Sequence, residues 1–341
     1  MNIGNVSSGR AKGKREFLVV YDHYVSLDWS QVTMVIAHQR RRDREARVVE
    51  SAASVAAVRE FLQRLKGTIV LTFEETTSAH WLYVELCGEV TRLIVCNPYK
   101  NRLLCDGPKT DKIDAAKLCL LLRAGLLTEV FHTNGELYDL RLLVSGYRDL
   151  VQAGVRAQNQ RSALGRGHAE RAKDITFILE HLTKSIELYE QSKGAYTEHF
   201  QRFCHRNTQL KLLLPISGIG TISAVTILAT VVDARRFPRS GKYLSYCGLV
   251  KLEKISGGRR YGSRKPQYSR VLKAVYKTAA MAAIRGNNPI REYYDVLVAR
   301  GMAEHHARHQ IARYIATVTY GVLKTGTVYN PYQWRQYTKV A

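Results

Sequence analysis

The order of extended and helical segments between residues 24 and 98 constrains the fold of this chain most strongly. Residues 24–28, 31–37 and 47–50 are short β-branched runs separated by polar turns, which predicts three strands that follow one another directly. The segments after them alternate between helical and extended patterns, at residues 55–65, 68–73, 81–87 and 93–96. Three meandering strands followed by alternating helices and strands are the order expected of an RNase H-type fold.

Helices are expected to dominate the chain from residue 136 onward. Residues 136–207 are almost wholly helical in pattern, with apolar residues such as Leu140, Leu143 and Tyr147 at three-four spacing. The Arg/Gly-rich residues 158–173 are expected to turn the chain back, which leaves two antiparallel helices or a dimerising coiled coil as alternatives. Further along, the expected segments are a glycine- and arginine-rich loop over residues 256–264 and helices over residues 216–229, 268–285 and 307–323.

The excess of basic residues indicates a polyanionic partner. The 341 residues include 52 Lys and Arg against 29 Asp and Glu, which gives a net charge of +23 and a pI near 9.9. Such an excess is unfavourable through self-repulsion unless a polyanion screens it, and nucleic acid is the usual polyanion. A ribosomal-type or merely basic protein is the alternative.

Three features of the sequence bear on the compartment. No apolar run approaches the roughly 20 residues that a membrane helix needs. Residues 1–15 are polar and basic without an apolar stretch behind them, so a mobile arm is expected there rather than a secretory signal. The six cysteines are scattered without a Cys-x-x-Cys pair, which argues against zinc and a disulfide framework and favours a reducing cytoplasm.

Four acidic residues lie at positions that the predicted elements bring together. Asp28 closes the first strand, and Glu74 closes the strand expected beside it. Asp111 and Asp114 open the next predicted helix, three residues apart and therefore on one face. Four neighbouring carboxylates repel one another unless a divalent metal neutralises them, and hard oxygen ligands favour Mg²⁺ or Mn²⁺. Two such ions about 4 Å apart can clamp the attacking and leaving oxygens of a phosphodiester. The alternative is that Asp111 and Asp114 only complement the helix dipole.

A second candidate is Ser256, which precedes two glycines. Such a serine can expose its hydroxyl on a turn, while Arg259 and Arg260 hold phosphate oxygens. A serine hydroxyl is a poor nucleophile unless a metal or a neighbouring base activates it, and no histidine lies nearby in the sequence. The alternative is a flexible basic turn that only touches DNA phosphates.

Nucleic-acid contacts are expected at two further places. Ser217-Gly-Ile-Gly220 precedes a helix and is similar to a helix-hairpin-helix turn, in which the backbone N–H groups around Gly218 and Gly220 hold a phosphate. An ordinary helix start punctuated by glycine is the alternative. Basic residues interleaved with tyrosines also suit a face that binds phosphates and stacks on bases. These residues are Arg259, Arg260, Arg264, Lys265 and Arg270, with Tyr261 and Tyr268 between them.

These features together resemble one family, the DEDD transposases of bridge-RNA-guided insertion sequences, which are relatives of the Piv-type DNA invertases. The resemblance runs through nearly the whole chain from Tyr24 to Leu323. Its most specific motif is Lys109-Thr-Asp-Lys-Ile-Asp-Ala115, shortly after Cys96-Asn-Pro98. The other motifs are Ser217-Gly-Ile-Gly220, Gly248-Leu-Val250 with Ser256-Gly257, and Tyr320-Gly-Val-Leu-Lys324. Carried over by position, the acidic tetrad of the family falls on Asp28, Glu74, Asp111 and Asp114, and its catalytic serine falls on Ser256.

The resemblance implies a fold class of α/β plus α. The implied parts are a basic N-terminal arm (1–20), a RuvC-like domain of RNase H fold (21–130), a helical coiled-coil segment (131–207) and a mostly helical C-terminal transposase domain (208–341). It also implies Mg²⁺-assisted attack by Ser256 on a scissile phosphate, which gives a phosphoserine DNA intermediate and a free hydroxyl that later reseals the strand. The acids of one protomer would face the serine of another.

The resemblance also implies the partners. These are donor and target DNA, a structured noncoding bridge RNA that pairs with both, and further copies of the chain in a dimer to a tetramer. No membrane is expected among them. The expected location is the prokaryotic cytoplasm, at the nucleoid.

The chain departs from the family pattern beside its glutamate. The family usually has Thr-Gly shortly after this residue, whereas this chain has Glu74-Glu75-Thr76-Thr77. Glu75 is therefore a rival of Glu74 as a metal ligand, although strand alternation points it to the other face. Asp22 is a rival of Asp28, because it lies at the same strand parity.

Two other functions are the alternatives. A metal-dependent nuclease or junction resolvase would use only the acids and would form no covalent protein–DNA adduct. A non-catalytic nucleic-acid-binding scaffold predicts that Asp111→Ala leaves every activity intact. The four acids argue against the scaffold, and the Ser-Gly-Gly turn argues against the simple nuclease.

Overall fold

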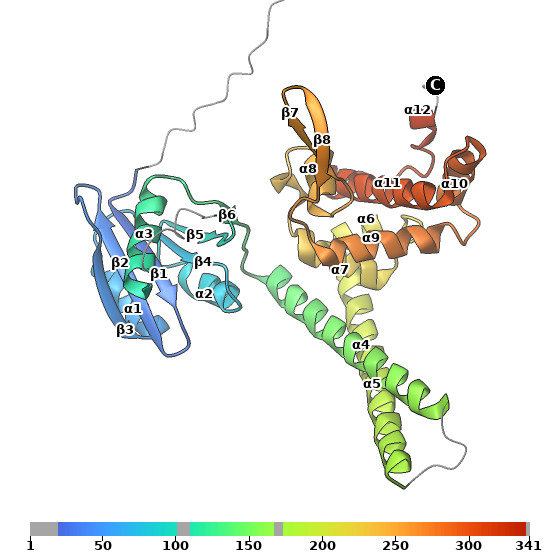
Figure 1. The fold of residues 1–341 in the computed structure, drawn as a ribbon, viewed down its shortest axis with the longest axis horizontal. Helices are drawn as coiled ribbons and strands as arrows, with labels where there is room; N and C mark the ends of the chain where they lie inside the picture. Colours follow the sequence, from blue (N-terminus) through green and yellow to red (C-terminus); the bar gives the residue numbers. More distant parts are fainter. Residues whose placement is uncertain (1–19, 101–109, 167–172, 339–341) are drawn as a thin grey trace, which may run out of the picture. The chain divides into compact units, whose positions relative to one another are not determined.

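A computed structural model describes residues 20–100, 110–166 and 173–338 of the chain (Figure 1). The chain forms two compact units, one up to Asn134 and one from Gly135 onward. The expected basic arm, except for residue 20, lies outside the described residues, as does Lys109 of the most specific motif. In the described part, no helix is long and apolar enough to cross a membrane.

The N-terminal unit is built on one mixed six-stranded sheet in the order β3-β2-β1-β4-β5-β6. Its strands are β1 (His23–Trp29), β2 (Thr33–Arg40), β3 (Arg47–Ala52), β4 (Ile69–Glu74), β5 (Arg92–Cys96) and β6 (Glu129–Val130). Strands β1 to β3 form an antiparallel meander, β4 and β5 run parallel to β1, and β6 pairs antiparallel with β5. The expected RNase H-like mixed sheet is therefore confirmed. The sequence did not predict β6, whose two residues are too few to show a strand pattern.

Helices cover both faces of this sheet. They are α1 (Val55–Gln63), α2 (Ala79–Leu86) and α3 (Asp111–Arg123). Helices α1 and α2 share one apolar cluster with odd-numbered strand residues such as Leu27 and Phe73. Helix α3 packs through Ala115 on the other face, where the even-numbered Tyr24 and Val70 lie. Because side chains alternate along a strand, every even-numbered residue of β1 and β4 is directed toward α3.

Helix α3 is fixed at its start, middle and end. The Thr110 side chain caps its start by accepting a hydrogen bond from Ile113 N at 3.3 Å. The buried Ser26 Oγ of β1 donates to Ala115 O at 2.6 Å. At the last residue, the Arg123 guanidinium donates to Asp43 O at 2.6 Å and to Arg41 O at 2.8 Å. The helix is therefore held to the sheet along its whole length.

The C-terminal unit is mainly helical, as expected. Its helices are α4 (Glu136–Arg166), α5 (Lys173–Arg206), α6 (Thr208–Leu213), α7 (Thr221–Val231), α8 (Ser240–Tyr246), α9 (Arg270–Ala283), α10 (Pro289–Ala299), α11 (Glu304–Thr325) and α12 (Arg335–Thr338). Its core includes Tyr243 and Tyr276, which are fully buried and whose hydroxyls share a hydrogen bond of 2.5 Å. The sequence predicted α7, α9 and α11, and it missed α6, α8, α10 and α12.

Helices α4 and α5 pack against each other as an antiparallel pair, which is one of the two expected alternatives (Figure 1). Close approach is visible where Gly154 of α4 faces the Tyr189 ring of α5, because a Cβ at Gly154 would lie 2.4 Å from ring carbons. The turn expected over residues 158–173 begins later than predicted. Helix α4 continues to Arg166, since the residues before it are mostly good helix formers, and residues 167–172 lie outside the described part.

The prediction of a loop over residues 256–264 is wrong. The structure has a β-hairpin there, made of β7 (Leu252–Ser256) and β8 (Arg259–Arg264). Gly257 and Gly258 form its two-residue turn with φ angles of 55° and 76°. Two positive φ angles are what a tight type I′ hairpin turn requires, so the glycines that suggested a loop instead join two strands.

Candidate functional site

Two of the predicted acids lie side by side at the carboxyl ends of central strands. Strands β1 and β4 run parallel with Leu27 paired to Phe73, so the next residues along them are Asp28 and Glu74. Both side chains are half-buried. Both are even-numbered and therefore lie on the α3 face of the sheet.

The other two acids enter this region from the first turn of α3. Asp111 and Asp114 precede Ala115, which packs on the same face of the sheet. The pKa of Asp28 is raised, first because the carboxyl is removed from water and then because the charges of Asp111 and Asp114 disfavour a third negative charge. The predicted elements therefore bring at least three of the four carboxylates within electrostatic reach of one another.

The chemistry of this cluster fits a hard divalent cation. Asp114 is half-buried, and its Oδ1 atom is shielded from solvent without a hydrogen-bond partner among the described residues. A buried carboxylate oxygen without a donor is unfavourable, and a cation would satisfy it. In the described part of the chain, however, no three His, Cys, Asp or Glu side chains converge closely enough to hold a metal ion. The acids are neighbours that do not form a complete coordination sphere.

The two rival acids lie elsewhere. Asp22 precedes β1 at its amino end, where its Oδ2 atom accepts hydrogen bonds of 2.8 Å from both Thr68 N and Thr68 Oγ1. These bonds lower the pKa of Asp22, and the bond from the backbone N–H of Thr68 has the larger effect. Asp22 is therefore at the opposite end of the strand from Asp28 and has a structural role.

Glu75 faces a pair of histidines that the sequence did not reveal. Its Oε1 atom lies 3.8 Å from Nε2 of His132, whose side chain is 5% exposed. Nδ1 of His132 lies 2.9 Å from Nδ1 of His80. These residues are 52 positions apart in the chain, so no local pattern links them. Glu74 keeps the position beside Asp28.

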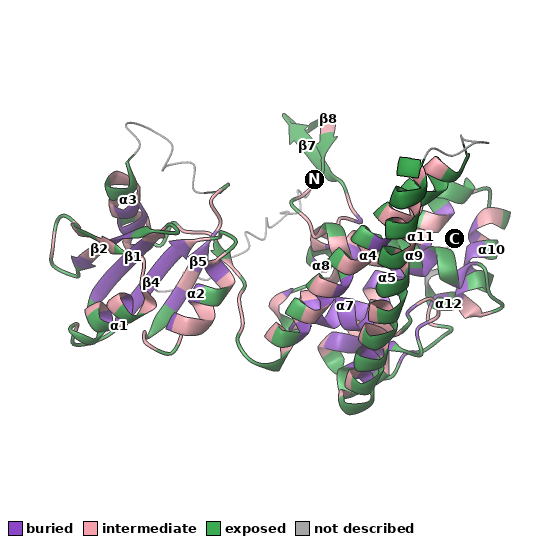
Figure 2. Cartoon of the chain, turned by 90° about the horizontal axis from the view of Figure 1, so that it is seen from below, coloured by how far each residue is buried: buried purple, intermediate pink, exposed green. Residues whose placement is uncertain are grey.

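Ser256 lies at the tip of the β7–β8 hairpin, paired in the ladder with Arg259. Every residue of β7 is exposed, as Figure 2 shows by the green colour of the hairpin. The Ser256 hydroxyl forms no side-chain hydrogen bond with any described residue. Arg260 Nη1 pairs with Glu253 Oε1 at 3.1 Å, and Tyr261 is the extra residue at a shift in register. The structure therefore presents the serine to solvent without a base beside it.

The other predicted nucleic-acid contacts follow the hairpin. Arg264 ends β8, Lys265 comes next, and both are exposed. Arg270 is the first residue of α9, whose start is capped by Ser269 Oγ accepting from Leu272 N at 3.3 Å. Of the two tyrosines expected to stack on bases, Tyr261 is 67% exposed and Tyr268 is half-buried.

The two glycines before α7 differ in role. Gly218 has a φ of +88°, and a Cβ there would lie 2.2 Å from the backbone oxygen of Ala279 in α9. Gly218 is therefore required by packing. Gly220 is the N-cap residue of α7, and a Cβ there would meet nothing within 4 Å. Of the two, only Gly220 lies beside open space.

Comparison with known proteins gives matches over both units. Residues 25–165 match the DEDD family of IS110 transposases, and residues 210–295 match the transposases of the IS116/IS110/IS902 family. The chain is 27% identical over 156 residues to an uncharacterized 43.6 kDa protein of insertion element IS110 from Streptomyces coelicolor, across 46% of this chain and 38% of that protein. It is 24% identical over 257 residues to a probable family 20 transposase from Pseudomonas aeruginosa, across 67% of this chain and 75% of that protein.

The matches differ in how much of each relative they span. The first relative is covered over little more than a third of its length, whereas the second is covered over three quarters. The two family matches occur in order along one chain, the first beginning in β1 and including all four acids, the second including the hairpin and α9. Over both units, the chain is therefore similar to transposases of the IS110/IS116 family, with a match to the DEDD domain followed by a match to a second transposase domain.

Proposed function

We propose that the protein is an RNA-guided DNA recombinase that cuts and rejoins DNA through Ser256, with Mg²⁺ held by Asp28, Glu74, Asp111 and Asp114. Mn²⁺ is the alternative ion. The observation that carries the proposal is the acidic cluster, in which burial and then the charges of Asp111 and Asp114 disfavour the ionised form of Asp28, while Asp114 Oδ1 has no partner among the described residues. Carboxylates that repel one another without a cation become favourable when one is bound.

Each protein group has a defined part in the reaction. The Ser256 Oγ forms a bond to the scissile phosphorus while the bond from that phosphorus to one DNA oxygen breaks, so one phosphodiester replaces another. The Ser256 hydroxyl gives up its proton as this bond forms, and the departing strand end takes up one proton and leaves as a free hydroxyl, so the protons balance. The reverse attack by a strand-end hydroxyl on the phosphoserine restores both the DNA and the serine. When bound, a divalent metal supplies charge neutralisation and orientation of phosphate oxygens.

The partners follow from charge, surface and resemblance. The net charge of +23 supports donor DNA, target DNA and a structured noncoding RNA as polyanionic partners. Exposed apolar side chains on α5 support association of several copies, from a dimer to a tetramer. These are Phe177 at 60%, Ile178 at 44% and Leu188 at 64% exposure. Acids of one protomer would then meet Ser256 of another, in the cytoplasm at the nucleoid.

The second candidate is a metal-dependent nuclease or junction resolvase that uses only the acids. It is favoured by one observation, namely that the Ser256 hydroxyl has no base beside it. The two candidates differ in a single product, because only the recombinase forms a covalent bond between protein and DNA.

The test combines the purified protein, the noncoding RNA of its element, donor and target DNA, and Mg²⁺. A denaturing protein gel should show a DNA-linked band for the wild type that is absent for Ser256→Ala. Ser263→Ala is the matched control, since Ser263 is an exposed serine on the same hairpin and should keep the band. DNA cleavage without any adduct, unchanged in Ser256→Ala, would contradict the serine mechanism and leave the nuclease.

A further inference from the structure

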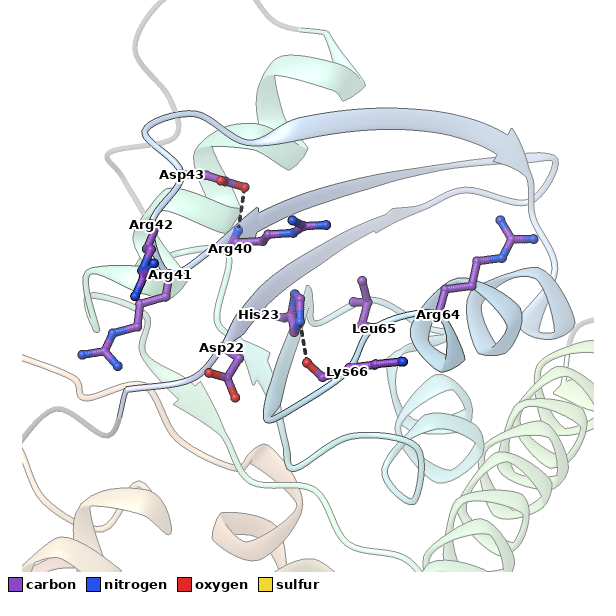
Figure 3. Close-up of a pocket in the computed structure, with 9 residues that line it drawn as sticks. All are labelled: Asp22, His23, Arg40, Arg41, Arg42, Asp43, Arg64, Leu65 and Lys66. Carbon is purple, nitrogen blue, oxygen red and sulfur yellow. Dashed lines mark hydrogen bonds between the residues drawn. The ribbon is translucent and has the colours of Figure 1, made fainter.

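A basic cleft of about 660 Å³ lies in the N-terminal unit, at the amino end of β1 (Figure 3). Two segments form its walls. The end of β2 and the turn after it contribute Arg40, Arg41 and Arg42, and the end of α1 with the following loop contributes Arg64 and Lys66. Five cationic side chains therefore surround one hollow, and all five residues are exposed. From the sequence, the segment with the three arginines was predicted only to be a polar turn.

The two acids in the cleft are already engaged within the protein. Asp22 accepts both hydrogen bonds from Thr68, and Asp43 Oδ2 accepts a hydrogen bond of 3.1 Å from Arg40 N. Arg64 pairs with Glu60. The other four cations, Arg40, Arg41, Arg42 and Lys66, form no ion pair with a described acidic residue. The cleft therefore has an uncompensated positive charge.

The backbone that carries these cations is held firmly. Gln39 Nε2 donates to Asp43 O and Arg44 O at 3.1 Å each, and Arg123 bonds the carbonyls of Arg41 and Asp43. On the facing wall, His23 Nε2 lies 3.0 Å from the carbonyl oxygen of Lys66, as the dashed line in Figure 3 shows. The side chains of Arg40, Arg41 and Arg42 take no part in these bonds. The backbone positions from which these side chains project are thus set in advance, which lowers the entropy lost on binding.

The position of the cleft separates it from the acidic cluster. Asp28 lies near the other end of β1, five residues from His23, or roughly 17 Å at the usual rise of a strand. A phosphate held between the arginines is therefore not the one beside the carboxylates. The described side chains that line the cleft include no Phe, Tyr or Trp, and the one imidazole among them, that of His23, is buried, so the cleft offers no exposed ring on which an unpaired base would stack.

We propose that this cleft binds the phosphodiester backbone of a nucleic-acid duplex, away from the strand at the acidic cluster. Guanidinium groups hold phosphate oxygens through paired hydrogen bonds, and backbone contacts of this kind position a duplex without reading its sequence. The proposal deepens the proposed function and rests on it, because it assigns a place to a second nucleic-acid segment. Its chemistry is shared by DNA and RNA duplexes.

The test measures binding by the full-length protein in EDTA, so that cleavage plays no part. The probes are a duplex DNA, a duplex RNA and single-stranded oligo(dT), each about 20 nucleotides per strand, titrated at several salt concentrations. Replacing Arg40, Arg41 and Arg42 together by Ala should weaken duplex binding about tenfold at about 0.1 M salt and lower the salt slope by about 2 to 3. Lys66→Ala should act in the same direction, with a slope change of about 1.

Two controls separate the cleft from a general effect of charge. Replacing Arg156, Arg161 and Arg166 of α4 by Ala removes the same charge from exposed positions outside the cleft and should change binding much less. Replacing the three cleft arginines by Lys keeps the charge and should keep most of the salt slope. The thermal unfolding of the triple Ala variant should match the wild type, because only the carbonyls of the turn are bonded to Arg123.

The outcomes are distinct. A loss confined to duplex RNA or to duplex DNA supports the cleft and names the nucleic acid that it binds, and a loss for both supports it as a shared site. Unchanged duplex binding, an equal loss in the α4 control, or a loss for oligo(dT) alone would overturn the proposal. Because the assay needs no metal, failure of the recombinase mechanism would appear as missing adduct with the duplex binding of the cleft intact.

Discussion

The acidic cluster and the serine hairpin are held by opposite kinds of scaffold. Asp28 and Glu74 project from the two central strands of a six-stranded sheet that is covered by helices on both faces (Figure 2). Ser256 lies on an isolated two-stranded hairpin whose first strand is exposed throughout. Two-stranded hairpins without a packed face are marginally stable in water. The carboxylates are therefore positioned by the fold itself, whereas the serine needs a partner to fix its position.

The largest expected effect is a difference in hydrogen exchange. Backbone amides of β1 and β4 should exchange more slowly than those of β7 and β8 by about 10³-fold or more, because the sheet opens only with the core of its unit. Exchange followed by mass spectrometry measures both in one sample. Added DNA and RNA should slow exchange in the hairpin far more than in β1 and β4. Equal protection of hairpin and sheet in the free protein would contradict this difference in scaffold.

The next effect tests whether weak packing is confined to the hairpin. Gly218→Ala should lower the free energy of unfolding by about 2 to 4 kcal/mol, because its positive φ and the nearby Ala279 oxygen exclude a side chain. Gly220→Ala, only two residues away in open space, should lower it by less than about 1 kcal/mol. Urea unfolding measures both. Similar values for the two variants would show that the body beneath the hairpin is also loosely packed.

A smaller effect concerns the pH dependence of the N-terminal unit. Burial, and then the charges of His23 and Arg40, lower the pKa of His38 from 6.5 to about 4. Between these two pH values the unfolded chain binds a proton that the folded chain does not, so stability is lost as the pH falls from about 6.5 toward 4. From about pH 7 to pH 5 this loss amounts to about 2 kcal/mol.

The variant His38→Gln removes the titration and keeps a side chain that forms hydrogen bonds. Its unfolding free energy should fall less than that of the wild type over this pH range, by about 2 kcal/mol. Titrating groups that do not contact His38 affect both proteins alike, and His23, whose Nδ1 lies 2.9 Å from His38 Nε2, is the one neighbour that the substitution changes among the described hydrogen bonds. Parallel pH profiles would show that the pKa of His38 is not lowered in the folded state. They would mean that water reaches this part of the sheet more than its packing indicates.

The smallest expected effect concerns the repulsion stored in the acidic cluster. Asp28→Asn should raise the unfolding free energy in EDTA by about 1 kcal/mol, because it removes one of three mutually repelling carboxylates. Added Mg²⁺ should raise the melting temperature of the wild type and not that of the variant. Ser256→Ala should change neither the unfolding free energy nor the response to Mg²⁺, since Ser256 is exposed. A melting temperature of the wild type that does not respond to Mg²⁺, together with no gain in stability for Asp28→Asn, would argue against metal at these acids.

Much of the N-terminal fold is predictable because its pattern is local. The alternation around Tyr24, Val25 and Leu27 defines a strand with two buried faces, and this pattern alone places Asp28 at a strand end, as the run before Glu74 does for that residue. The hairpin was not predicted, because the pair Gly257-Gly258 is as typical of a loop as of a tight turn between strands.

The missed parts of the candidate sites depend on contacts between distant segments. His80 and His132 meet only after β6 has paired with β5. The cleft combines the Arg40–Arg42 turn with Lys66, which lies across a strand and a helix in sequence. The role of Gly218 depends on where α9 passes, more than 60 residues later. Local patterns therefore identified the strand-end acids, whereas tertiary packing decided which other residues join them.

Helix α3 has one property that bears on how such a protein can vary. Its first turn carries Asp111 and Asp114, and its last residue, Arg123, holds the turn that bears the arginines of the basic cleft. Each residue of a helix advances the chain by about 1.5 Å and rotates it by about 100°. One inserted or deleted residue within the helix would therefore swing the carboxylates out of line with the turn. Replacements on its exposed face leave both ends aligned. During divergence, this helix can change in composition far more freely than in length.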